Sequence, residues 1–386
     1  MSLHGNDKTI KPFYPTLPST KAEIESQSVS RGPKQVVATV SRKHGGVQHA
    51  SSPCELLRNE RQVSYIHTRK KASRVPSLGD AIDPLADQVF AMMQSAKLSD
   101  SLGLFVRETR PSPEPAFILA HDRQLDGLVR FCAIANGFSV LSVDPTFKLG
   151  DFDVTPITYR HRLLVSTRSG KDPVMIGPVL IHYRKTFHTY LFFAATLVGL
   201  RPGLEGLRAF GTDGEKALAD AFSHEFHYAV RLTCSIHCRR NVKTQLQDLG
   251  YPESARREIL DDLFGCQHGN TFSEGLVDSV NAKEFSQKLD ILERRWDEIT
   301  KTCSAQPGFY DWFTRNKAAT ILQTMLKPVR EEAGLGSPPD AFSTNASETV
   351  NSIIKSHVSY KPSQLIELTE KLKDAIDEQE RELKEQ

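Results

Sequence analysis

Apolar and polar positions alternate along this 386-residue chain in a way that predicts a sheet with flanking helices. Three apolar runs rich in β-branched residues are separated by short turns, which predicts an antiparallel meander. These runs cover residues 138–150, 154–166 and 174–183. Further along, the spacing predicts helices over 187–203, 216–226 and 238–250, and strands over 207–215 and 229–237. The order βββαβαβα predicts an α/β protein with a mixed sheet.

The patterning also divides the chain into five parts. Residues 1–75 are rich in Ser, Pro, Lys and Arg with little periodicity, which predicts a largely disordered arm. Residues 76–136 predict a lead-in of helices and a strand, and residues 137–250 the first part of the core. Residues 251–340 predict a purely helical insertion. Residues 341–386 predict two helices, the second with a leucine stripe.

Charge is spread unevenly between the arm and the rest. Residues 1–75 hold 13 Lys and Arg against 5 Asp and Glu, whereas the remainder holds 36 against 42. This asymmetry indicates a basic arm that is either a solvated tail or a contact for nucleic acid. Within it, "HTRKKASR" (67–74) is a candidate nuclear-localisation segment, so a nuclear location is expected.

Cysteine usage and hydropathy indicate an intracellular protein. Six scattered cysteines in a chain of this length are typical of a reducing compartment rather than of a disulfide scaffold. The first twenty residues lack the apolar core of a signal peptide. The longest apolar stretch, 190–200, is too short to span a bilayer, so no membrane partner is expected.

Three acidic residues stand out by their position in the pattern. Asp144 follows an apolar strand in "LSVDPTFKLG", and Asp213 follows another in "GTDGE". Glu348 lies opposite the apolar stripe of the helix predicted over 343–358. Taken singly, they are typical of a turn, a helix cap and a solvated face. Together they predict a cluster whose repulsion is relieved by cations, and all-oxygen ligands suit two Mg²⁺ or Mn²⁺ ions.

These motifs resemble those of Mutator-like element (MULE) transposases. "VDPTFKLG" resembles that family's first-aspartate strand, and "FGTDGEKALADAFSHEF" its second-aspartate motif. "TCSIHCRRNV" is similar to its Cys-x-x-His block, and "TNASETVNSIIK" to its third-acid helix. The resemblance covers about residues 115–360.

The resemblance implies an RNase H-like fold, with a mixed five-stranded sheet, flanking helices and an all-helical insertion. It implies that Asp144, Asp213 and Glu348 are the catalytic acids and bind Mg²⁺ or Mn²⁺. It further implies that the partners are transposon-end and target DNA, and that the protein forms a homo-oligomer on DNA.

The role of the Cys/His block stays open at this point. Cys234 and His237 would need two more ligands for a closed Zn²⁺ site, and Cys238, Cys266 and His268 are the candidates. Otherwise Cys234 ends a buried strand and His237 caps a helix or lines the active site. In the next helix, Arg239, Arg240 and Lys243 are candidate contacts for DNA phosphates, or else belong to a solvated face.

The first functional hypothesis is a DDE transposase that cuts and joins DNA with divalent metal. The alternative is a domesticated or decayed transposase-derived protein that binds DNA without catalysis, which the lack of recognisable flanking zinc-binding modules favours. A nuclease without joining activity is a third hypothesis, which the long insertion disfavours. A fourth is other phosphate chemistry at "GTDGE", although the Gly-Lys-Ser/Thr ending of a P-loop is absent from the sequence.

Overall fold

The computed structural model describes residues 15–27, 36, 39–40, 49–57, 62–63, 66, 84–145, 151–166, 170–269, 271–358 and 363–384. It divides into two compact units, Met1–Asp83 and Pro84–Gln386. The first unit contains helix α1 (Pro18–Gln27) and the short 3-10 helix η1 (Pro53–Glu55), inside the range predicted to be largely disordered. A small buried cluster there contains Ile24, Val36, Val40, Leu57 and Val63. The basic run 67–74 lies outside the described residues.

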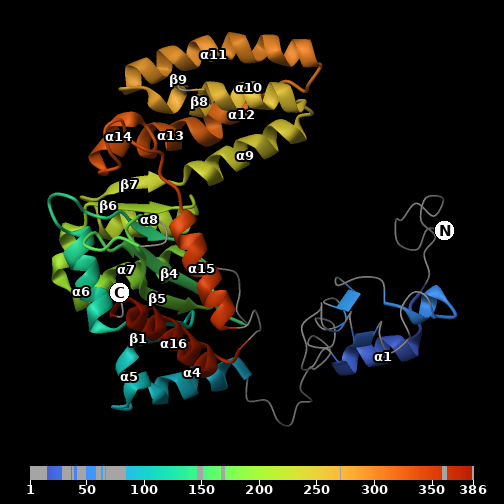
Figure 1. Cartoon of the computed structure of the whole chain (residues 1–386), viewed down its shortest axis with the longest axis vertical. Coiled ribbons are helices and arrows are strands. Elements are labelled where there is room, and N and C mark those ends of the chain that lie inside the picture. The colour runs from blue at the N-terminus through green and yellow to red at the C-terminus, as the bar shows by residue number, and fades with distance from the viewer. Residues whose placement is uncertain are drawn as a thin grey trace. The chain divides into compact units, whose positions relative to one another are not determined.

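A mixed sheet forms the centre of the second unit (Figure 1). Its strands are β1 (Val106–Arg110), β2 (Ala116–Leu119), β3 (Leu141–Val143), β4 (Asp153–Arg160), β5 (Val174–His182), β6 (Ala209–Thr212) and β7 (Val230–Thr233). They lie in the order β1-β2-β5-β4-β3-β6-β7. Every pairing from β1 across to β3 is antiparallel, whereas β3, β6 and β7 are parallel. The predicted α/β class, mixed sheet and antiparallel meander are therefore confirmed.

The predicted number of five strands is wrong, because β1 and β2 extend the same sheet beyond β5. Strand β2 pairs with β5 from Ala116 opposite His182 to Leu119 opposite Val179. All four residues of β2 are buried, since helices cover both faces of the sheet at this point. The core and its lead-in therefore share one sheet.

Helices cover both faces of the sheet and give three layers (Figure 1). On one face, α6 (Asp122–Cys132), α7 (Phe187–Leu200) and α8 (Lys216–Glu225) bury a cluster with Leu128, Phe193 and Phe222. The other face is covered by α4 (Pro84–Ser95), α15 (Asn345–His357) and α16 (Leu365–Lys384). Alternate residues of β2 belong to opposite clusters, as the pleat of a strand requires. The short helix α5 (Ser101–Phe105) leads into β1, and η2 (Pro202–Gly206) follows α7.

Between β7 and α15 the chain forms a layer with a core of its own, in which Trp296, Phe309 and Phe313 are buried. Its helices are α9 (Ser235–Asp248), α10 (Glu253–Phe264), α11 (Ala282–Cys303), α12 (Phe309–Phe313), α13 (Ala319–Thr324) and α14 (Lys327–Glu332), with η3 (Leu276–Asp278) and the π-helical turn η4 (Thr314–Ala318). The predicted all-helical insertion is corrected in one respect. Strands β8 (Cys266–His268) and β9 (Thr271–Ser273) form an antiparallel hairpin, with Gly265 at φ +72° and Gly269 at φ +59° beside β8.

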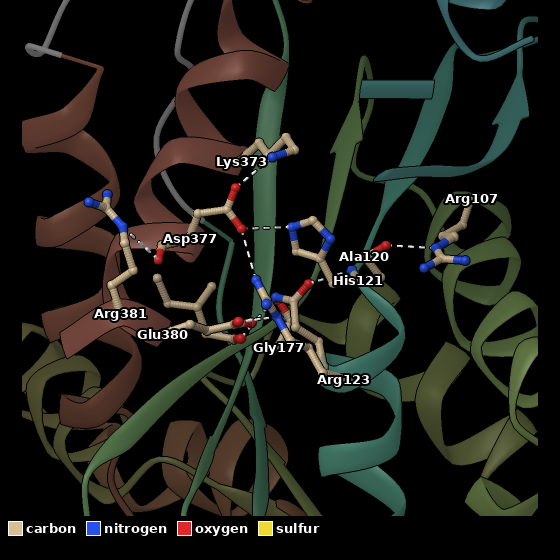
Figure 2. Close-up of polar contacts among 11 residues, drawn as sticks. Arg107, Ala120, His121, Arg123, Gly177, Lys373, Asp377, Glu380 and Arg381 are labelled. Carbon is tan, nitrogen blue, oxygen red and sulfur yellow. Dashed lines mark hydrogen bonds and ion pairs between the residues drawn. The ribbon is translucent and has the colours of Figure 1, made fainter. Parts of the chain in front are cut away.

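The C-terminal helix α16 is fastened to α6 and β5 by polar contacts as well as by its leucine stripe. Figure 2 shows Asp377 facing His121 and Arg123 at the start of α6. Its Oδ1 lies 3.1 Å from His121 Nε2 and accepts a 2.8 Å hydrogen bond from Arg123, while its Oδ2 accepts one from Lys373 at 2.5 Å. Gln379 bonds the backbone of Ile176 and Val174 in β5.

No helix among the described residues combines the length and the apolarity needed to cross a membrane.

Candidate active site

Asp144 and Asp213 lie at the same edge of the sheet. Strands β3 and β6 are parallel neighbours, and Val143 pairs in register with Thr212. Asp144 and Asp213 are the next residues along these two strands. Because the carboxyl ends of parallel neighbours meet at one edge, the two carboxylates lie close together, where open α/β sheets place their ligands.

The carboxyl group of Asp144 is buried and strongly perturbed by its surroundings. Its residue surface is only 7 % exposed. Burial, followed by the negative charges of Asp213 and Glu348, raises the pKa of Asp144 to about 7. Asn351 of α15 donates a hydrogen bond to its Oδ2 at 3.2 Å. Near neutral pH this carboxyl therefore exchanges a proton easily, or accepts a cation in its place.

Asp213 lies in a tight turn that fixes its carboxylate. Its Oδ1 accepts a 2.9 Å hydrogen bond from the backbone N–H of Glu215, and Gly214 between them has a φ of +100°. A side chain at position 214 would be strained in that conformation, so glycine shapes the turn. Glu215 lies near Asp213, and its Oε1 accepts a 3.1 Å hydrogen bond from the Tyr190 hydroxyl. Burial raises the pKa of Glu215.

Helix α15 carries Glu348 and is anchored against β3 and β4 by buried hydroxyl groups. The Oγ of Ser347 lies 2.8 Å from the Oγ of Ser142 and 2.9 Å from the Oγ1 of Thr158. The next residue, Glu348, has a side chain that is 54 % exposed. Its charge contributes to the raised pKa of Asp144, so the third predicted acid belongs to the same electrostatic environment.

The Cys234 and His237 pair links the start of α9 to the start of α15. Cys234 is fully buried, and its Sγ accepts hydrogen bonds of 3.4 Å from both the N–H and the hydroxyl of Thr344. His237 Nδ1 lies 3.4 Å from the same hydroxyl, and its Nε2 lies 4.0 Å from Glu348 Oε1. His237 therefore faces Glu348 from the side of α9, and Cys234 helps to position the start of α15 through Thr344.

The donor set suits a hard divalent cation, although the acids do not converge into a finished coordination sphere. Among the residues that the structure describes, no three Asp, Glu, His or Cys side chains form a group that could hold a metal ion. Two neighbouring acids nevertheless contribute to the raised pKa of Asp144, which shows that the three carboxylates repel one another. A bound cation would relieve this repulsion. Asp144 and Asp213 supply oxygen ligands of the kind that Mg²⁺ and Mn²⁺ prefer, and Glu348 is the nearby third donor.

The three basic residues of α9 lie in different surroundings. Arg239 lies 3.4 Å from Asp261 and places its guanidinium 5.6 Å from the ring centre of Phe264. Arg240 and Lys243 are exposed on the outer surface of the helix. Arg240 and Lys243 are therefore the more exposed of the three predicted contacts, whereas Arg239 is partly engaged by Asp261.

Some residues of the site were not among the predicted ones. Asn351, Ser347 and Thr344 all lie on or beside α15 and contact the strand ends or α9. Asn351 and Ser347 are one helical turn apart, which is the one sequence signal that places them on one face. Lys185, whose Nζ lies 3.8 Å from Asp153 Oδ1, adds a positive charge that lowers the pKa of Asp144.

Comparison of the chain with protein-family models and with curated proteins gives no match.

Proposed function

We propose that this chain is a MULE-like DDE transposase with an RNase H-like core, which cleaves DNA strands and transfers them with divalent metal. The order β5-β4-β3-β6-β7, with three antiparallel strands followed by two parallel ones, supports the RNase H-like core. The insertion between β7 and the helix of the third acid agrees with the arrangement expected for such transposases (Figure 1).

One observation carries the proposal. Two carboxylates follow aligned residues of neighbouring parallel strands, and the helix bearing a third acid is fixed beside them through Asn351 and Ser347. Asp144, Asp213 and Glu348 would hold two Mg²⁺ or Mn²⁺ ions. Bound there, such ions activate a water or a 3′-hydroxyl and stabilise the leaving oxygen of a phosphodiester.

The chain's own groups orient these ligands. The Asn351 amide fixes Oδ2 of Asp144, and the Glu215 N–H fixes Oδ1 of Asp213, so each carboxylate presents a defined oxygen. Burial of Asp144 excludes water from one side of the site. Arg240 and Lys243, exposed on α9, are proposed to contact DNA phosphates. We further propose that the protein assembles as a homo-oligomer on DNA and is located in the nucleus.

The proposal is tested by incubating the protein and Mn²⁺ with supercoiled plasmid and a labelled oligonucleotide that carries a free 3′ end. We expect nicked plasmid and covalent transfer of the label into it, both abolished by Asp213→Asn. The matched control is Asp248→Asn, a change of charge at an exposed residue at the end of α9, which should retain both products. Nicking without transfer would identify a nuclease, and equal products from all three proteins would reject the acidic site.

A transposase-derived protein that binds DNA without catalysis is the second candidate. The 54 % exposure of the Glu348 side chain favours it. It predicts DNA binding with neither nicking nor transfer, and binding that does not change when Asp144 or Asp213 is replaced by Asn.

A further inference from the structure

A pocket of about 440 Å³ lies beyond the carboxyl end of β7, next to the edge that carries the acids. Thr233 and Ser235 belong to its lining, and Thr233 pairs in register with Thr212, the residue before Asp213. The opposite walls come from the insertion, where α13 and α14 pack against β7 (Figure 1). The pocket and the candidate active site therefore lie at the same edge of the sheet.

The lining is unusual because large apolar side chains are exposed in it. Phe272 of β9 is 53 % exposed and Ile236 of α9 is 40 % exposed, and both line the pocket together with Phe264 and Phe342. Apolar surface left in contact with water is unfavourable, and its concentration in one concave place indicates a ligand.

The positive charges of the lining each have an acidic partner, within the lining or just outside it. Arg239 lies 3.4 Å from Asp261, and Lys327 lies 3.4 Å from Glu274. A phosphate would find no unbalanced positive charge here. A flat, uncharged ring that stacks on an aromatic side chain would suit the same surroundings.

The walls are fixed from behind by a buried arginine. Arg330 is 6 % exposed and donates hydrogen bonds to the carbonyls of Met325 at 2.9 Å and Pro339 at 2.8 Å, and to Asp278 Oδ1 at 2.6 Å. These bonds join α14, η3 and the segment that leads to α15. Because its walls are fixed in this way, the pocket is pre-formed.

We propose that this pocket binds an unpaired nucleobase of the DNA, stacked on Phe272, while the adjoining backbone lies at Asp144 and Asp213. The ring surfaces supply stacking, and Arg240 and Lys243, exposed on the same helix as Ile236, would hold the neighbouring phosphates. That the base comes from DNA rests on the proposed function, whereas the pocket's affinity for a flat ring does not.

The test measures binding of the full chain to three 20-base-pair duplexes by fluorescence anisotropy, with EDTA present so that no strand is cut. One duplex is fully paired, one carries a single bulged base, and one carries an abasic residue at the same bulge. We expect the bulged base to bind roughly tenfold more tightly than the bulged abasic residue, because stacking of one base on an aromatic side chain contributes on this scale.

Phe272→Ala should bring that ratio close to one and leave the affinity for paired duplex unchanged. Ile236→Ala, at a second wall, should reduce the ratio less. The matched control is Phe90→Ala on α4, which also removes an exposed phenylalanine, 63 % exposed, but outside the pocket lining. It should keep the tenfold preference.

Three results would overturn the inference in distinguishable ways. Duplex binding with no preference for the bulged base rejects the pocket's role and leaves the proposed function standing. No binding to any of the three duplexes rejects both. A lack of preference, together with a smaller assembly of Phe272→Ala than of the wild type in sedimentation, would instead assign the pocket to a second copy of the chain.

Discussion

The buried carboxyl group of Asp144 destabilises the metal-free protein when it is ionised. Its folded pKa is about 7, against an ordinary value of 3.8. Between about pH 4 and pH 7 the native state therefore keeps a proton that the unfolded chain has released. Its contribution to stability falls as pH rises through this window and stays at its lowest above pH 7.

Asp144→Asn should for this reason stabilise the metal-free protein. We expect the free energy of unfolding at pH 8 to rise by about 1–3 kcal/mol, and the gain to disappear near pH 4. Urea denaturation in EDTA across this range measures it, with Asp248→Asn as the control. A gain of equal size at every pH would show that the ionisation of Asp144 is not what destabilises the protein.

Gly211 of β6 leaves room for the ring of Phe342, which belongs to the segment that leads to α15 and Glu348. A Cβ at Gly211 would lie 2.2 Å from the Phe342 ring. Gly211→Ala should lower the free energy of unfolding by about 1–3 kcal/mol, since a buried ring must move. Gly199→Ala in α7 meets nothing within 4 Å and should be stabilising by about 0.5–1 kcal/mol. Equal effects of the two substitutions in urea denaturation would refute this.

At the residue scale the sequence contained the acids but not the groups that orient them. Asp144 and Asp213 could be predicted because each directly follows an apolar strand. Asn351 and Ser347 are ordinary polar residues of a helix, and their importance depends on which face of α15 the sheet covers. That face is determined by tertiary packing, so local patterning does not reveal it.

At the element scale, α16 is held partly by one carboxylate that contacts three basic side chains. Asp377→Ala would remove the acceptor that Arg123 and Lys373 share, while Arg123 would keep its ion pair with Glu380 (Figure 2). We expect thermal unfolding to show a loss of about 1 kcal/mol, because the cluster is partly solvated. Glu370→Ala, at an exposed residue of the same helix, should change stability by less than about 0.5 kcal/mol. Equal melting temperatures for both variants would show that the apolar stripe alone retains α16.

The elements themselves were predictable to the extent that their periodicity is local. The meander and the alternating strands and helices follow from apolar spacing. The attachment of β2 to β5 does not, because it joins segments about sixty residues apart. The β8–β9 hairpin also escaped prediction, since three-residue strands are too short to show a period of two.

At the scale of the whole molecule, the central claim is that strand ends and α15 together form a site for divalent metal. The arrangement depends on distant parts of the chain, since Asp144 and Asn351 are 207 residues apart in sequence. Metal binding should therefore depend on the folded second unit as a whole rather than on either motif alone.

The most direct measurement is a calorimetric titration of Mn²⁺ into the wild type, Asp213→Asn and Asp248→Asn, with and without duplex DNA. We predict that the wild type and Asp248→Asn bind Mn²⁺ alike, more tightly with DNA, and that Asp213→Asn loses at least tenfold in affinity. Tenfold corresponds to about 1.4 kcal/mol, which is modest for the loss of one charged ligand. Equal binding by all three proteins, or no binding to folded wild type with DNA present, would contradict the account.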